Sequence, residues 1–201
     1  MSIPQLVHRL LQNVAYVIVR YMNAAIDASS LIVLAKFNAI QEAIDVYGTL
    51  GITRSIEQET VHAGKIRGYA EAQRIEVAIV KGQIIVSEIN NDIIKRATEL
   101  RTSSTALSES DCHIIAFAAV KTLPLILQDR RARLAAEAIG VETISIVGLP
   151  LAVYIQTNAK YDRCIALLNQ ICKALSLDPA IQKALRAAID EIKRLRKNNG
   201  G

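Results

Sequence analysis

Aromatic residues and cysteines are scarce in this chain. Its 201 residues include no tryptophan, two phenylalanines and three cysteines, and the hydrophobic fraction of 51% is dominated by alanine, valine, isoleucine and leucine. An aliphatic core of this kind suits a sheet that is covered by helices on both faces. The cysteines are odd in number and form no C-x-x-C pair, which argues against a disulfide framework and a structural zinc site. A reducing compartment, the cytoplasm, is therefore expected.

Several other patterns are missing. No uninterrupted run of about 18 apolar residues occurs, so no membrane-spanning helix is expected. The glycines form neither the G-x-G-x-x-G nor the Walker pattern that binds a nucleotide cofactor. Three histidines are too few to argue for a Ser-His-Asp or Cys-His triad. The chemistry of the chain is therefore sought among its carboxylates.

The positive charge is concentrated near the carboxyl end. Residues 1–150 hold 15 basic and 15 acidic residues, whereas residues 151–201 hold 9 basic and 4 acidic residues, which leaves the net charge of +5. A basic end is compatible with a polyanionic partner. A solubilising helix end explains the same charge without a partner, and the sequence leaves both interpretations open.

Short apolar strands alternate with helical segments through most of the chain. Strands are expected at 23–28, 52–53, 84–87, 125–128 and 142–147. Such alternation implies parallel strands that are joined by right-handed crossovers.

Helical patterns flank this alternating region on both sides. An amphipathic helix is expected over residues 4–20, a helical pattern covers 149–177, and Asp178-Pro179 is a strong start for a last helix. Tyr154 and Tyr161 would then lie on one helix, where they either pack or stack on bases. The chain accordingly divides into an N-terminal helical extension (1–21), an α/β domain (22–150) and a basic C-terminal helical extension (151–201).

Four acids fall where strands end or helices begin. Asp27 and Asp129 follow expected strands, and Glu59 and Asp111 lie near helix starts. In a doubly wound sheet these positions can converge at the carboxyl edge, where ligands bind. Carboxylates that converge raise each other's pKa, and a divalent cation such as Mg²⁺ or Mn²⁺ neutralises them best. Each acid also has a local explanation, because acids at helix starts cap the helix or interact with its dipole.

The ordered set of acidic motifs resembles that of PIN-domain proteins. The motifs read AAIDASSLI at 24–32, IEQE at 56–59, LSESDCHIIAFA at 107–118 and LILQDRRAR at 125–133. The resemblance covers about residues 22–150. It implies a three-layer α/β/α domain with a central parallel sheet, to which the N- and C-terminal helices are added.

The same resemblance implies a Mg²⁺- or Mn²⁺-dependent ribonuclease. Asp27, Glu59, Asp111 and Asp129 would bind the metal and carry catalysis, and Ser29 would orient a metal-bound water. Glu109 would be a fifth acid of the site or a helix-start charge. Arg130, Arg131 and Arg133 would either bind RNA or be solvated side chains.

Three residues qualify the match to the family. Glu57 competes with Glu59 for the second acidic position, and the spacing from Ile56 favours Glu59. Gln128 stands where many members have an acid or a threonine, and Ser108 replaces a common glycine.

The family also suggests partners. Many members are toxins of the VapC type, which act on RNA, are neutralised by an antitoxin protein and are often homodimers. The alternative is a catalytically weak or inactive PIN-like module that binds nucleic acid or protein partners, and Gln128 supports that alternative.

Overall fold

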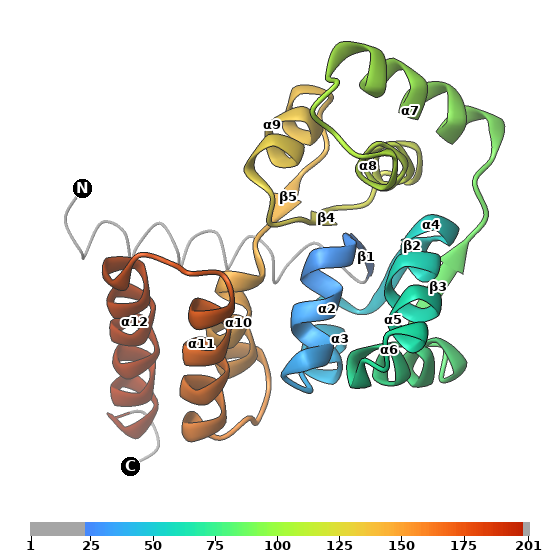
Figure 1. The fold of residues 1–201 in the computed structure, drawn as a ribbon. Helices are drawn as coiled ribbons and strands as arrows, with labels where there is room; N and C mark the ends of the chain where they lie inside the picture. Colours follow the sequence, from blue (N-terminus) through green and yellow to red (C-terminus); the bar gives the residue numbers. More distant parts are fainter. Residues whose placement is uncertain (1–22, 199–201) are drawn as a thin grey trace. The chain divides into compact units, whose positions relative to one another are not determined.

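In a computed structural model of the chain, residues 23–198 are described. The predicted helix over residues 4–20 lies outside the described residues. The described part divides into two compact units, residues 23–146 and residues 147–198. Figure 1 follows the chain through both units.

The first unit is built on a sheet of five parallel strands in the order β3-β2-β1-β4-β5. The strands are β1 (Asn23–Ile26), β2 (Thr49–Thr53), β3 (Ile84–Ser87), β4 (Leu125–Ile126) and β5 (Thr143–Ile144). The chain moves from β1 through β2 to β3 on one side, and returns to β4 and β5 on the other side. In the register, Ala25 pairs with both Gly51 and Leu125. The strand order therefore reverses between β1 and β4.

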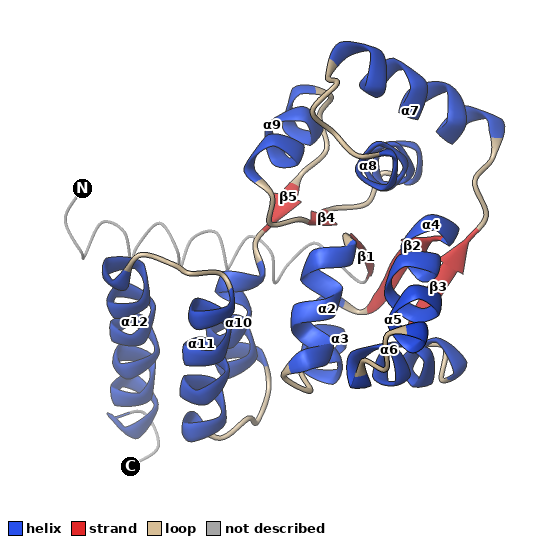
Figure 2. Ribbon diagram, in the orientation of Figure 1, coloured by secondary structure: helices blue, strands red, loops and turns tan. Residues whose placement is uncertain are grey.

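This reversal places helices on both faces of the sheet, because right-handed connections that run in opposite directions cover opposite faces. One face carries α2 (Ala28–Lys36), α3 (Ile40–Tyr47), α5 (Ala63–Ile66) and α6 (Ala70–Val80), and the other carries α7 (Asn91–Ser103), α8 (Glu109–Lys121) and α9 (Arg130–Ala138) (Figure 2). Between β2 and α5 run α4 (Arg54–Glu57) and a π-helix, η1 (Gln58–His62). The predicted three-layer α/β/α fold is confirmed.

The core between these layers is aliphatic. Ile26, Leu50 and Leu125, on the three central strands, are fully buried. The helix α8 packs on β2 through Phe117. The Phe117 ring approaches Gly51 so closely that a Cβ added to Gly51 would lie 3.1 Å from the ring. Gly51 therefore allows the helix to pack directly on β2.

The second unit is helical. It follows η2 (Ile146–Gly148), whose first residue is the last of the first unit. Its helices are α10 (Leu149–Gln156), α11 (Tyr161–Ala174) and α12 (Pro179–Asn198), and α12 packs against both α10 and α11. The helical pattern predicted over 149–177 is present as two helices, so the expectation that Tyr154 and Tyr161 share one helix is wrong. Thr157 ends α10, because its hydroxyl accepts the Ala159 amide at 3.1 Å and turns the chain out of the helix. Tyr154 and Tyr161 consequently lie on different helices.

Across residues 23–198, none of the helices has the combined length and apolar character that crossing a membrane requires.

Candidate active site

Asp27 lies directly after β1, at the point where the strand order reverses. It is the N-cap residue of α2, and only 4% of the residue is exposed. Its Oδ1 accepts the Ser30 backbone amide at 2.9 Å, and its Oδ2 accepts the Ser29 hydroxyl at 2.6 Å. The crevice beyond the strand ends at such a switch point is where open α/β sheets bind ligands. Asp27 is thus a buried acid at the place where a ligand is expected.

The pKa of the Asp27 carboxyl is raised above its ordinary value of 3.8. Burial is the largest cause, because removal from water disfavours the charged form. The hydrogen bonds from Ser29 and Ser30 partly offset this effect, and the negative charge of Asp111 raises the pKa further. Asp111 therefore lies near enough to Asp27 for the two carboxylates to repel each other.

Asp111 is held at the amino end of α8 by a capping box with Ser108. Its Oδ2 accepts the Ser108 hydroxyl at 2.7 Å and the Ser108 amide at 3.1 Å. The serine that replaces the common glycine is therefore the cap of this helix. Glu109, two residues earlier in the same turn, is exposed, and its Oε2 lies 3.5 Å from Nη1 of Arg101. The helix start fixes one acid and leaves the other at the surface.

Asp129 and Gln128 follow β4, the neighbour of β1. Asp129 is exposed and caps α9, where its Oδ1 accepts the Ala132 amide at 2.9 Å. The Gln128 Oε1 accepts the Ser145 hydroxyl at 3.0 Å, which ties the end of β4 to the residue that follows β5. The glutamine in the family's acidic position is thus engaged in a hydrogen bond of the fold.

Three arginines belong to α9, the helix that Asp129 caps. Arg130 and Arg131 are exposed in its first turn. Arg133 lies 3.8 Å from Glu137, measured from Nη2 to Oε1. Exposed guanidinium groups at this end of the helix can contact the phosphates of a nucleic acid that approaches the strand ends.

Glu59 lies in η1 and is exposed. In this π-helix each turn holds about one residue more than in an α-helix, so the positions after Gln58 face in other directions than α-helical spacing predicts. The Thr60 hydroxyl donates to the Ile56 carbonyl at 2.8 Å within the same stretch. Glu59 therefore lies on the solvent-exposed side of η1.

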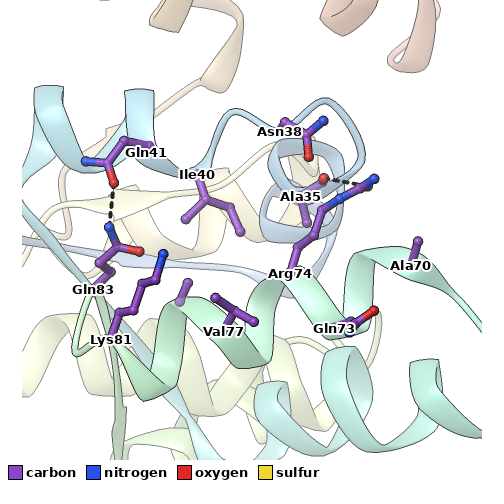
Figure 3. Close-up of a pocket in the computed structure, with 11 residues that line it drawn as sticks. Ala35, Asn38, Ile40, Gln41, Ala70, Gln73, Arg74, Val77, Lys81 and Gln83 are labelled. Atoms are coloured by element: carbon purple, nitrogen blue, oxygen red, sulfur yellow. Dashed lines mark hydrogen bonds between the residues drawn. The ribbon is translucent and has the colours of Figure 1, made fainter.

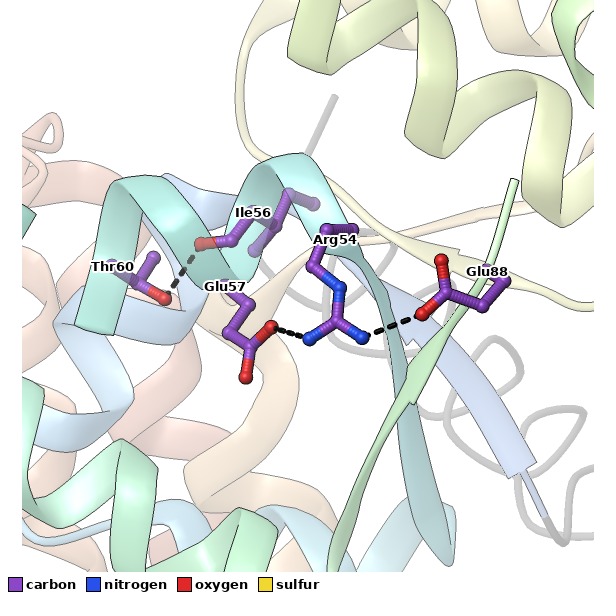
Figure 4. Close-up of polar contacts among 5 residues, drawn as sticks. All are labelled: Arg54, Ile56, Glu57, Thr60 and Glu88. Atoms are coloured by element: carbon purple, nitrogen blue, oxygen red, sulfur yellow. Dashed lines mark hydrogen bonds and ion pairs between the residues drawn. The ribbon is translucent and has the colours of Figure 1, made fainter. Parts of the chain in front are cut away.

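Glu57 takes part in an ion-pair network that the sequence interpretation missed (Figure 4). Arg54 Nη1 lies 2.5 Å from Glu57 Oε2, and Arg54 Nη2 lies 2.5 Å from Glu88 Oε1. Arg54 follows β2 and Glu88 follows β3, and neighbouring parallel strands end at the same edge. The one sequence signal is that both residues directly follow expected strands, and only the strand order makes them neighbours. The side chain of Glu57 is only 14% exposed, so the network holds it against the domain.

A comparison with protein families decides what this edge belongs to. A family model described as a PIN domain matches residues 23–178. The chain belongs to the PIN-domain family. None of the curated proteins compared with the chain matches it. PIN domains are generally nucleases that use divalent metal ions, so this chain has a nuclease-type fold and is a hydrolase at that coarse level.

In this fold Asp111 lies within electrostatic range of Asp27, but the four predicted acids are not gathered into one group among the described residues. Within residues 23–198, no three side chains of Asp, Glu, His or Cys form a group that could hold a metal ion. The physical reason is that Asp27, Asp111 and Asp129 each bind the amino end of their own helix. Glu59 is carried to the surface by η1. Glu59 and Asp129 remain predicted ligands.

A hydrated ion of the kind that PIN domains use needs fewer protein ligands than such a group supplies. Mg²⁺ is usually bound through one or two carboxylates and keeps several waters. The Ser30 hydroxyl, at the start of α2, is buried and has no hydrogen-bond partner among the described residues. A buried polar atom of this kind is normally satisfied by a protein group or a water. Asp27, with Ser30 next to it and Asp111 within electrostatic range, is therefore the candidate position for such an ion and its bound water.

The hollow shown in Figure 3 is not part of this acidic edge. It has a volume of about 390 Å³ and is lined by residues at the carboxyl end of α2, along α6 and before β3, including Arg74, Lys81 and Gln83. Because α2 begins at the carboxyl edge, its far end lies toward the amino edge of the sheet. No acid lines the hollow. It therefore lacks the carboxylates through which proteins usually bind Mg²⁺.

Proposed function

We propose that this PIN-domain protein is an endoribonuclease that hydrolyses RNA phosphodiester bonds with Mg²⁺ or Mn²⁺. The observation that carries the proposal is Asp27, a buried carboxylate of raised pKa at the switch point of the sheet, within electrostatic range of Asp111. A buried charge is costly unless it is paired or coordinates a metal. A bound cation accounts for both acids, and family membership supplies the nuclease chemistry.

The residues divide the work as follows. Asp27 and Asp111 would hold the metal ion, with Glu59 and Asp129 as further ligands when substrate is bound. Such an ion supplies an activated water and stabilises the leaving oxygen of the phosphodiester. Ser29 holds Oδ2 of Asp27 through its hydroxyl at 2.6 Å and so orients the carboxylate.

The arginines of α9 bind the substrate in this proposal. Arg130 and Arg131 are exposed in the first turn, next to Asp129. A guanidinium group can donate two parallel hydrogen bonds to a phosphate. These contacts position the RNA backbone without reading its sequence.

The test is RNA cleavage by the purified full chain with added Mg²⁺ or Mn²⁺. Asp27→Asn should reduce cleavage to background, because the amide is a poor ligand for a hard cation. Asp45→Asn, a change of the same kind at an exposed position of α3, is the matched control and should leave cleavage unchanged. Undiminished cleavage by Asp27→Asn would remove Asp27 from the mechanism.

One biological form of the proposal is the toxin of a toxin–antitoxin pair in the cytoplasm, acting as a homodimer. It rests on family membership, because toxins of the VapC type are PIN domains. An antitoxin should then inhibit RNA cleavage in stoichiometric amounts by covering the acidic edge. A short reading frame next to this gene identifies the protein to test, and failure of its product to inhibit would leave an RNA-processing role.

The second candidate is an inactive PIN module that binds nucleic acid or protein partners. Gln128 favours it, since the amide occupies an acidic position of the family and is bonded to Ser145. Calorimetric titration with Mn²⁺ separates the two candidates. Heat of binding that Asp27→Asn removes supports the nuclease, and no heat with RNA binding retained supports the module.

A further inference from the structure

The helix α12 accounts for most of the net positive charge of the chain. It contains six basic and two acidic residues, so it contributes 6 − 2 = +4 to the net charge of +5. The match to the PIN family ends at residue 178, and α12 begins at Pro179. The charge therefore lies on an element that the family match does not include.

One face of α12 is apolar and packed, and the other is basic. Ala184, Leu185, Ala188 and Ile189 are buried. The exposed side carries Lys183, Arg186, Arg194 and Lys197. From residue 183 to residue 197 the helix rises by about 21 Å, at about 1.5 Å per residue. The cations thus form an extended row rather than a single point of charge.

Two cations of α12 are held in place by tyrosine rings of the neighbouring helices. Lys193 Nζ lies 3.5 Å from the centroid of the Tyr161 ring, and Arg196 Cζ lies 4.7 Å from that of Tyr154. The two rings meet edge to face at 6.1 Å. Arg196 Nη2 also donates to the Ile155 carbonyl at 3.0 Å. Cation–π contacts of this kind fix the heads of long side chains, which lowers the entropy cost of binding an anion.

The two acids of the helix are engaged within the unit. Asp190 accepts the Tyr161 hydroxyl, and both oxygens of Glu191 accept from Arg194, at 2.6 and 2.9 Å. Both carboxylates of α12 are therefore bonded to groups of the same unit. The remaining cations give the exposed side of α12 a net positive charge that complements a polyanion.

We infer that α12 binds the phosphate backbone of RNA. Because both ring faces that contact Lys193 and Arg196 are occupied by these cations, contact is through charge rather than through bases stacked on those faces. Binding of this kind is sequence-tolerant and depends strongly on salt. The inference rests on the proposed function only in taking RNA as the polyanion.

The test measures the affinity of the full chain for a fluorescent single-stranded RNA against salt concentration. All proteins carry Asp27→Asn and are kept in EDTA, so cleavage plays no part. The α12 variant combines Lys183→Gln, Arg186→Gln, Lys193→Gln and Lys197→Gln. The control removes the same charge from exposed positions of the first unit with Lys81→Gln, Lys95→Gln, Arg96→Gln and Lys121→Gln. Circular dichroism checks that both variants remain helical.

The expected result is a salt dependence that weakens only in the α12 variant. Each phosphate contact contributes about 0.7 to the slope of log affinity against log salt for single strands, so four contacts contribute about 3. Between 50 and 200 mM salt, the parent should lose about fifty-fold more affinity than the α12 variant. The control variant should keep the parent slope.

Three outcomes would overturn the inference. The α12 variant could keep the parent slope, or both variants could lose slope equally, which would indicate net charge alone. Polyglutamate could also compete as well as unlabelled RNA, which would make α12 a docking surface for an acidic protein. The proposed function is tested separately, by measuring RNA cleavage by the wild-type chain with added metal. If the wild-type chain does not cleave RNA, the proposed function fails but the inference about α12 stands, because RNA binding is measured without metal.

Discussion

Replacing Asp27 by asparagine should stabilise the folded protein at neutral pH. The residue is 4% exposed, and its carboxyl has a raised pKa because burial disfavours the charge. Asparagine keeps the cap, since it accepts the Ser30 amide as well as aspartate does. The change therefore removes a buried charge and retains the hydrogen bond. The free energy of unfolding should rise by about 1 kcal/mol, because substitutions that remove an unfavourable feature of a functional site commonly stabilise a protein by this amount.

The dependence on pH follows from the direction of the shift. An acid whose pKa is raised in the folded state loses its proton more readily in the unfolded chain, so the wild type loses stability as pH rises above 3.8, the ordinary value for Asp27. The loss is complete once pH exceeds the raised pKa. The advantage of Asp27→Asn should therefore be absent at low pH, grow through this window and stay constant above it.

Asp27→Ala separates the two contributions. Alanine also removes the charge, but it loses the cap of α2, which costs about 1 kcal/mol. The stabilities of the wild type, Asp27→Asn and Asp27→Ala are compared by thermal melts in EDTA across the pH range. For a chain of this length, 1 kcal/mol corresponds to a shift in Tm of about 2–4 °C. If asparagine is no more stable than the wild type at pH 8, or if its advantage grows as pH falls, the account of Asp27 as a costly buried charge is refuted.

Two more predictions follow from metal binding and backbone conformation. Mn²⁺ at 100 times its Kd should stabilise the wild type by about 2.7 kcal/mol and Asp27→Asn by much less, which thermal melts would show; equal stabilisation would place the ion elsewhere. Thr122 is an exposed β-branched residue at the end of α8, and its backbone lies in the left-handed region at φ 53°. Thr122→Gly should therefore raise the free energy of unfolding by about 1 kcal/mol. The neighbouring control Lys121→Gly should instead lose about 0.5–1 kcal/mol in the same denaturant titration, and a loss at both positions would contradict strain at Thr122.

Much of the candidate site was predictable because its signals are local. Asp27 follows an apolar run and precedes serines, so both the strand end and the helix cap could be recognised. Ser108 and Asp111 stand three apart, which is the spacing of a capping box. The alternation of strands and helices fixes the parallel sheet, since right-handed connections leave few other arrangements.

Other features depended on residues far apart in the chain. Arg54 and Glu88 are 34 positions apart, and they meet because β2 and β3 are neighbours in the sheet. Gly64 packs so closely on Ala72 that a Cβ there would lie 2.8 Å away, a constraint from α6 on the segment that follows η1. A hydrophobic pattern with α-helical spacing cannot reveal such a constraint.

The sequence by itself determined the order of the elements, the caps that begin the helices and the acids that follow the strands, because these depend on neighbouring residues. Only the tertiary structure decided that Asp27 and Asp111 interact, that Glu59 is exposed on a π-helix and that Tyr154 and Tyr161 hold cations of α12. Each of these depends on packing between separate elements, which fixes where a side chain points.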